Sequence, residues 1–330
     1  KMQKLDNARE FGVGELKMDD ETQQSTRKST QHDIKRTPNN LDTKEETYSN
    51  DIYNKSKEIK RSYDNKKDKL KYQKTIVPKI TIVIPTYNKK HYLKETIESC
   101  LQQDYPNLEV IVGDDCSTDG THIMMKEYQH NKRIKYIKNK KNLGAGINST
   151  YLLFNHVDSK YAMILNHDDY LIKKDYISTA ADFLVSNPNV SFVWANCKVK
   201  NEISGQEGVV NFKNRKIVRG IDYFINYETS EYPHITGVLT TVFDLEKLKL
   251  TQYGNEKTMS KDTFLYLNLM LIGDVGFINE YVSVYRVHKD SISLNMQTEF
   301  DKSTIEEFEK MKSYVLEKKL AWKAEMRDWI

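Results

Sequence analysis

Between residues 79 and 165 the sequence repeats one pattern: a short apolar, β-branched run, a polar loop, and a segment with helical periodicity. Such runs have the length and composition of buried strands; they cover 79–85, 108–112, 133–137 and 161–165. Helical segments are expected at 91–103, from 119 to about 130, and after Gly144. Strands that alternate with helices over short connections favour right-handed crossovers. We therefore predict an α/β fold whose mostly parallel, Rossmann-like sheet has helices on both faces.

The two ends of the chain differ in composition from this middle part. Residues 1–75 are mainly Lys, Asp, Glu, Gln, Ser, Thr and Asn, with too few apolar positions to offset the entropy of ordering them. We expect a polar extension at 1–75, flexible or partly helical, and a compact domain at 76–295. Residues 296–330 show the pattern of an amphipathic helix, with apolar positions at Ile305, Phe308, Met311, Val315 and Trp322. That helix could pack on the domain, on a second chain or on a membrane surface.

Charge and cysteine content exclude several classes of protein. The net charge is +4, from 51 basic and 47 acidic residues, which is too even to indicate nucleic-acid binding. Three dispersed cysteines, Cys100, Cys116 and Cys197, indicate free thiols in a reducing compartment. No run approaches the roughly 18 apolar residues that a membrane span needs, and the first residues have no apolar signal region. We expect a cytoplasmic protein, with peripheral attachment to the inner face of the membrane left open.

Polar and acidic residues gather where three of the predicted strands end. Thr86 and Asn88 follow the first, Asp114 and Asp115 the second, and the run 166–169 (Asn-His-Asp-Asp) the fourth. Ordinary turns also use Asn, Asp and Gly. Ligands of open α/β sheets, however, bind beyond the carboxyl ends of the strands. Three such loops at one edge, two of them with paired carboxylates, therefore predict a binding site.

Paired carboxylates are typical ligands of hard divalent cations. Such a cation can bridge a diphosphate and neutralise charge on a leaving group. Mg²⁺ or Mn²⁺ fits better than zinc, because the Cys and His residues are not clustered. A glycine-containing turn at 142–146 before a helix could let the backbone approach a nucleotide closely, although this signal alone is weak.

Six ordered motifs resemble those of family 2 glycosyltransferases, which have the GT-A fold. They stand at 84–88 (Ile-Pro-Thr-Tyr-Asn), 112–120 (Val-Gly-Asp-Asp-Cys-Ser-Thr-Asp-Gly), 142–148, 165–169 (Leu-Asn-His-Asp-Asp), 260–262 (Ser-Lys-Asp) and 285–288 (Tyr-Arg-Val-His), the last followed by Ser291 and Ser293. The resemblance covers about residues 79–294. It implies transfer of a sugar from a nucleotide-diphosphate donor, with UDP-sugars first among the candidates. The acceptor would be a hydroxyl on a glycan, a lipid-linked glycan or a protein, in bacterial cell-surface polysaccharide or glycoconjugate synthesis.

The resemblance also implies roles for individual residues. Asp262 matches the general base of an inverting displacement. Asp168 would ligate Mn²⁺ or Mg²⁺, with Asp169 supporting the ion and His288 meeting the metal or the diphosphate. The donor nucleotide would be bound by ten residues, namely Pro85, Thr86, Tyr87, Asn88, Asp114, Asp115, Asn142, Asn148, Asn166 and His167.

Two departures from the family pattern leave a second hypothesis open. Asn166 replaces an Asp, which weakens the expected ribose contact, and Lys261 replaces the usual Glu before the base. A non-catalytic member that binds nucleotide or glycan is therefore the alternative. Asp168, Asp169 and Asp262 could instead be helix N-caps, since Asp is favoured there, and His288 could be a surface histidine. Trp194 is expected in the core of a strand at 190–199, and His234 could face the acceptor.

Overall fold

The computed structural model describes residues 77–254, 260–291 and 297–317. The predicted extension at 1–75 lies outside these residues, as do Ser293 and Trp322.

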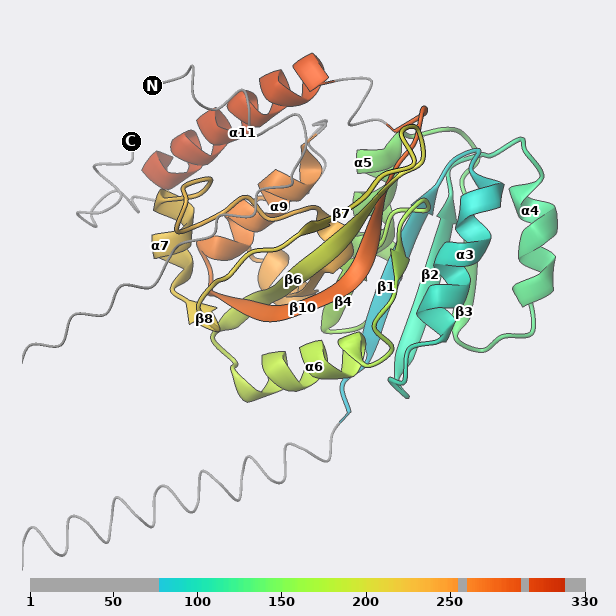
Figure 1. The fold of residues 1–330 in the computed structure, drawn as a ribbon, viewed down its shortest axis with the longest axis horizontal. Coiled ribbons are helices and arrows are strands. Elements are labelled where there is room, and N and C mark those ends of the chain that lie inside the picture. The colour runs from blue at the N-terminus through green and yellow to red at the C-terminus, as the bar shows by residue number, and fades with distance from the viewer. Residues whose placement is uncertain (1–76, 255–259, 292–296, 318–330) are drawn as a thin grey trace, which may run out of the picture. The chain divides into compact units, whose positions relative to one another are not determined.

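A ten-stranded sheet runs through the described residues (Figure 1). Its order is β3 (Ile134–Lys138), β2 (Leu108–Asp114), β1 (Ile80–Thr86), β4 (Tyr161–Ile164), β9 (Thr241–Asp244), β6 (Val190–Asn201), β10 (Asp274–Val287) and β5 (Tyr170–Leu171). The first four strands are parallel, as predicted. The second half of the sheet is mixed, because β9 runs antiparallel to both of its neighbours while β10 is parallel to β6. Two short strands, β7 (Glu207–Val210) and β8 (Ile217–Val218), pair antiparallel with β6 and β10.

Helices cover both faces of this sheet, because its strands are apolar on both sides. In β1, for example, Ile82 and Ile84 belong to one buried cluster and Val83 to the other. The first cluster packs under α3 (Lys90–Leu101), α4 (Thr121–Met124) with the 3₁₀ turn η2 (Met125–Tyr128), and α6 (Tyr176–Ser186). The second packs under α5 (Ala145–His156), α7 (Gly220–Ile225), α8 (Leu245–Leu248), α9 (Lys261–Met270) and α11 (Gln297–Glu317). A short 3₁₀ turn, η3 (Val238–Thr240), leads into β9.

The structure refines the predicted elements at several places. The helix expected from 119 to about 130 is one α-helical turn, α4, followed by η2. Trp194 is fully buried in β6, as expected. In α11, Met311 and Val315 are fully buried, whereas Ile305 is 65% exposed. The buried face of α11 is therefore rotated away from Ile305 and includes the polar side chains of Ser303 and Glu307.

Candidate functional site

The loops after β1 and β2 are fastened to each other by hydrogen bonds. Asn88, with a positive φ of 52°, accepts the Thr118 backbone N–H on Oδ1 at 2.8 Å. The Asn88 backbone N–H donates to Ser117 Oγ at 3.0 Å. Beside them, Tyr87 is 43% exposed, and the buried Thr86 hydroxyl has no hydrogen-bond partner among the described residues. The structure thus brings the predicted residues Pro85 to Asn88 to the carboxyl end of β1, at the sheet edge that the open-sheet rule selects.

Asp114 is a fully buried carboxylate with structural partners. It accepts the Ser117 backbone N–H at 2.7 Å and the Tyr136 hydroxyl at 2.5 Å. Burial and this bond to Asp114 raise the pKa of the Tyr136 hydroxyl, which therefore stays a donor. Asp114 thus holds β3 and the β2 loop together.

Asp115 is engaged by the glycine-containing turn before α5. Its carboxylate accepts the backbone N–H of Leu143 at 2.9 Å and of Gly144 at 2.8 Å. Asn139 Nδ2 donates both to Asp115 Oδ1, at 2.8 Å, and to Asn148 Oδ1, at 2.9 Å. The predicted residues Asp115 and Asn148 are therefore adjacent, but their polar atoms bind protein groups. The sequence reasoning missed Asn139, which lies just beyond β3 and joins them.

The other two asparagines predicted to bind nucleotide lie in turns. Asn142 Oδ1 accepts the Gly144 backbone N–H at 2.8 Å, and Gly144 has a φ of +87°, which favours glycine. The main-chain carbonyl oxygen of Asn166 accepts the Asp169 backbone N–H at 3.1 Å. His167, next to it, is half-buried with Nδ1 3.1 Å from the Pro85 carbonyl oxygen, and burial lowers the pKa of its imidazole. His167 thus connects the β4 loop to the β1 loop.

Asp168 follows β4 and His288 follows β10, and their side chains are in contact although 120 residues separate them. His288 Nε2 lies 3.0 Å from Asp168 Oδ2, and the histidine side chain is 4% exposed while the aspartate is 20% exposed. The Asp290 backbone N–H donates to His288 Nδ1 at 3.2 Å, so this contact assigns the ring proton to Nε2. As placed, His288 is therefore a donor toward Asp168. It could donate equally to a diphosphate oxygen, whereas ligating a metal through Nε2 would require the proton to move.

A buried arginine, Arg286, contacts the same tyrosine ring as His288. Arg286 is 2% exposed, and its guanidinium lies 4.7 Å from the Tyr92 ring centre and 4.9 Å from the Tyr170 ring centre. It forms ion pairs with Glu95 at 2.6 Å and with Glu202 at 3.3 Å. A charge this deeply buried persists only when it is paired. Here the stacking of two rings adds cation–π attraction.

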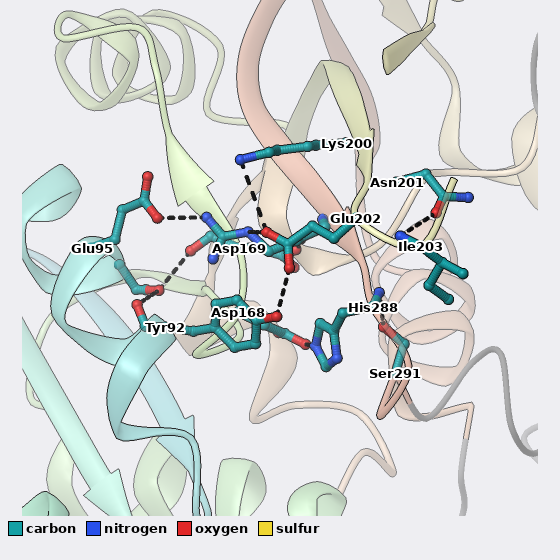
Figure 2. A network of polar contacts seen from close by, with 12 residues as sticks. Tyr92, Glu95, Asp168, Asp169, Lys200, Asn201, Glu202, Ile203, His288 and Ser291 are labelled. Atoms are coloured by element: carbon teal, nitrogen blue, oxygen red, sulfur yellow. Dashed lines mark hydrogen bonds and ion pairs between the residues drawn. The ribbon is translucent and has the colours of Figure 1, made fainter. Parts of the chain in front are cut away.

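Tyr92 connects Arg286 to His288. Its ring stacks on the His288 ring with centroids 4.8 Å apart, and its hydroxyl donates to Glu202 Oε2 at 2.6 Å (Figure 2). The sequence reasoning gave no role to Tyr92, Glu95 or Glu202. Only the position of Arg286 within the 285–288 motif hinted at such a network, and nothing local identified its partners.

Asp169 faces inward, unlike Asp168. It is 1% exposed, and its Oδ1 accepts the Arg286 backbone N–H at 3.0 Å. Burial, followed by the charge of Asp168, raises the pKa of the Asp169 carboxyl. The helix-cap alternative for Asp168 and Asp169 is excluded, because α6 begins at Tyr176 with Asp175 as its N-cap.

Asp262 stands apart from this network, in the first turn of α9. It is half-buried, and it shares no hydrogen bond or ion pair with Asp168 or His288 among the described residues. Its carboxylate is not the N-cap, since Ser260 occupies that position. Lys261, which replaces the family's Glu, donates to the Gly254 carbonyl at 2.7 Å and lies 5.0 Å from the centre of the Tyr253 ring. Its ammonium therefore anchors the 251–254 turn.

His234 contacts two residues of the segment that follows α7. Its Nδ1 lies 3.1 Å from Glu228 Oε1 and 3.3 Å from the Tyr227 hydroxyl. Burial is the main cause of the raised pKa of Tyr227, and the charge of Asp262 adds to it. Tyr227 thus contacts His234 and lies within range of the Asp262 charge.

The chain was compared with known proteins. Residues 81–239 match the family described as Glycosyl transferase family 2. TuaG of Bacillus subtilis, a glycosyltransferase assigned to teichuronic acid biosynthesis, is 28% identical over 226 residues, which cover 66% of this chain and 82% of TuaG. WfgD of Escherichia coli, a UDP-Glc:α-D-GlcNAc-diphosphoundecaprenol β-1,3-glucosyltransferase, is 27% identical over 66% of this chain and 80% of WfgD.

Solved structures show the same fold at low sequence identity. Staphylococcus aureus TarS 1–349 in complex with UDP-GlcNAc matches with a TM-score of 0.56 and 19% identity, over 72% of this chain and 66% of that chain. The mannosyltransferase PcManGT of Pyrobaculum calidifontis, in complex with GDP-Man and Mn²⁺, matches with a TM-score of 0.53 and 19% identity. The match covers 72% of this chain and 64% of PcManGT. The mixed α/β sheet is thus a GT-A fold. Residues 81–239 of this chain thus form a domain of glycosyltransferase family 2.

Proposed function

We propose that this protein is an inverting glycosyltransferase that moves a hexose or N-acetylhexosamine from a UDP-sugar to a hydroxyl of a bacterial cell-surface polymer. The observation that carries the proposal is the partly exposed Asp168–His288 pair at the strand ends, backed by a buried Arg286 network. Relatives whose names refer to UDP-Glc and to teichuronic acid support the donor and the setting. The GT-A structure with UDP-GlcNAc supports the donor class.

The residues at Asp168 fit a divalent cation bound together with the donor. Among the described residues, no three His, Cys, Asp or Glu side chains form a complete metal site. Mg²⁺-type sites, however, commonly use one or two carboxylates plus substrate phosphates and water. Asp168 would hold Mn²⁺ or Mg²⁺, and Asp169 would stabilise the loop beneath it. The ion would neutralise charge on the diphosphate, and the Nε2–H of His288 would donate to a diphosphate oxygen.

Asp262 supplies the base in this proposal. It would take the proton from an acceptor hydroxyl as that oxygen forms a bond with the anomeric carbon of the sugar. The bond from the anomeric carbon to the diphosphate oxygen breaks in the same displacement, so the nucleoside diphosphate leaves with the electron pair. The displacement inverts the anomeric centre and forms no covalent enzyme intermediate. His234, related to Asp262 through Tyr227, is a candidate for the acceptor side.

The acceptor is proposed to be a glycan, lipid-linked or protein-linked, presented at the cytoplasmic face of the membrane. The name of WfgD, which includes a diphosphoundecaprenol-linked acceptor, motivates the lipid-linked choice. No helix among the described residues combines the length and apolarity that crossing a bilayer requires.

A thermal-shift screen against UDP-, GDP-, CDP- and dTDP-sugars, with and without Mn²⁺, tests the donor. A ligand that binds the folded state raises its stability with occupancy, by about 2.7 kcal/mol at 100 times Kd. We expect a UDP-sugar with Mn²⁺ to give the largest shift. If none of these nucleotide sugars shifts the transition, the proposed function is wrong.

Donor hydrolysis, followed as UDP release, tests the catalytic roles. Asp168→Ala should lower kcat at least about 100-fold, because charge stabilisation on the leaving group is lost. Asp182→Ala, which removes an exposed carboxylate on α6, is the matched control and should retain wild-type turnover. A wild-type protein that binds a nucleotide sugar but neither hydrolyses nor transfers it would instead support the non-catalytic alternative.

A further inference from the structure

The buried face of α11 contains polar side chains next to the start of α9. Met311 and Val315 are fully buried and fix α11 in the apolar cluster that includes α9. One turn before Met311, Glu307 is 0% exposed, and two turns before it, Ser303 is 7% exposed. A helix that packed only through apolar contacts would have apolar residues at these positions.

The hydroxyls of this face contact the residue that begins α9. Thr304 Oγ1 lies 2.9 Å from Ser260 Oγ, and the Ser260 backbone N–H points to Ser303 Oγ at 3.4 Å. Ser260 is the N-cap of α9, yet its side chain makes no capping bond to the amides of α9. Its hydroxyl is directed to α11 instead, and Asp262 follows two residues later.

Glu307 adds a buried carboxyl group to the same face of α11. It lies one helical turn after Ser303 and Thr304 on the same face. Burial, followed by the charge of Asp262, raises the pKa of Glu307 to about 9, whereas Lys310 and Lys261 act in the opposite direction and Glu306 in the same one. Near neutral pH, Glu307 is therefore a protonated acid, so α11 does not place a second negative charge next to Asp262.

We propose that Ser303, Thr304 and Glu307 of α11 are positioning residues for Asp262, so that α11 forms part of the catalytic unit. The hydroxyls hold the first turn of α9 in place, and Glu307 lies fully buried one helical turn from them on the same face of α11. The role as a positioning device rests on the proposed function of Asp262 as the base.

Thr304→Val tests the hydroxyl, because valine keeps the shape of threonine but cannot bond to Ser260. With the donor and Mn²⁺ found by the screen, we expect Thr304→Val to lower kcat for donor hydrolysis about tenfold with the donor KM unchanged, the pattern of a loss confined to the transition state. Thr304→Ser, which restores the hydroxyl, should recover most of that loss. Equal turnover in Thr304→Val and the wild type would overturn the proposal.

A double-mutant cycle separates positioning from general loss of structure. If Thr304 acts through Asp262, then adding Thr304→Val to Asp262→Asn should lower the residual turnover by less than about twofold, because residues that act as a unit are non-additive. The full tenfold loss in the Asp262→Asn background would show a merely structural role and overturn the proposal.

The pH profile tests Glu307. The kcat of Glu307→Gln at neutral pH is the reference for its own pH profile, since glutamine has the shape and charge of the protonated acid. Above about pH 9, kcat should fall in the wild type as Glu307 ionises beside Asp262, and the fall should be absent in Glu307→Gln. Superimposable profiles for the two proteins would overturn this part of the proposal.

One further measurement keeps this inference distinct from the proposed function. If the wild type hydrolyses none of the nucleotide sugars, the proposed function fails and the rates above carry no information. Amide hydrogen exchange over residues 260–266 then decides whether α11 holds the first turn of α9. Faster exchange in Thr304→Val than in Thr304→Ser would support the contact, and equal exchange would exclude it.

Discussion

Asp168 and Asp262 carry the two proposed chemical roles, and the structure holds them in different ways. Asp168 lies in front of a buried polar network, in which Arg286 is enclosed by two tyrosine rings and two glutamates. Asp262 lies at a helix terminus whose position depends on a neighbouring helix, through hydroxyl contacts and buried methionine and valine side chains. The position of Asp168 therefore depends on the buried Arg286 network within the sheet. The position of Asp262 depends on how α11 packs against α9.

The largest effect is expected on the Asp168 side. Arg286→Ala would remove a buried cation, leave Glu202 without its arginine partner and leave a cavity between Tyr92 and Tyr170. Because Glu95 and Glu202 are partly exposed, the main cost is the cavity left by the side chain, about 2–5 kcal/mol for a large-to-small substitution in a core. Urea titrations of the wild type and Arg286→Ala should therefore show a clearly lower midpoint for the variant. A separate binding measurement should show that the variant has lost metal-dependent donor binding.

Arg219→Ala is the matched control for Arg286→Ala. Arg219 is paired with Asp222, but its side chain is 65% exposed. Exposed ion pairs contribute about 0–1 kcal/mol. If Arg286→Ala and Arg219→Ala lowered the urea midpoint equally, burial would not explain the contribution of Arg286 to stability. The proposed contrast between the Asp168 side and the Asp262 side would then be wrong.

The difference between the two sides also shows how far the sequence alone reaches. The strand ends and the order of the motifs are local patterns, so Asp114, Asp115, Asp168 and the parallel half of the sheet could be predicted. The partners of Arg286 could not, because Glu95 lies 191 residues away along the chain. Asn139 was missed for a similar reason: nothing in its neighbourhood shows that it joins Asp115 to Asn148.

The polar face of α11 was hidden by the same limitation. Glu307 stands between Ile305 and Phe308 in an amphipathic pattern, where a glutamate normally marks the solvent side. Glu307 is buried because α11 packs against α9. The apolar periodicity within 297–317 does not predict this burial. The exposure of Ile305 is the counterpart of this burial, because the docked face is rotated toward Glu307.

An intermediate effect, dependent on pH, is expected on the Asp262 side. Burial raises the pKa of Glu307 from 4.5 to about 9, so between these values the folded state binds a proton that the unfolded chain releases. The resulting stabilisation is complete below pH 4.5 and is lost as pH rises through about 9. The stability of the wild type relative to Glu307→Gln should thus fall by up to about 1.4 kcal/mol per pH unit in this window. Urea midpoints at pH 6, 7, 8 and 9 measure it, and a constant difference would mean that Glu307 is ionised in the folded protein.

The smallest effect is expected from Tyr92→Phe, which removes one hydroxyl from the Asp168 side and keeps the ring. Burial and the bond to Glu202 raise the pKa of Tyr92 to about 12, so the hydroxyl is a donor at neutral pH. Its loss should cost about 1 kcal/mol of stability, with kcat reduced less than about threefold because the ring still stacks on His288. Tyr92→Leu, which also removes the stacking, should lower kcat further at a similar donor KM. If Tyr92→Phe and Tyr92→Leu have the same kcat, the ring does not orient His288, and the Asp168 side depends on Arg286 and its carboxylates alone.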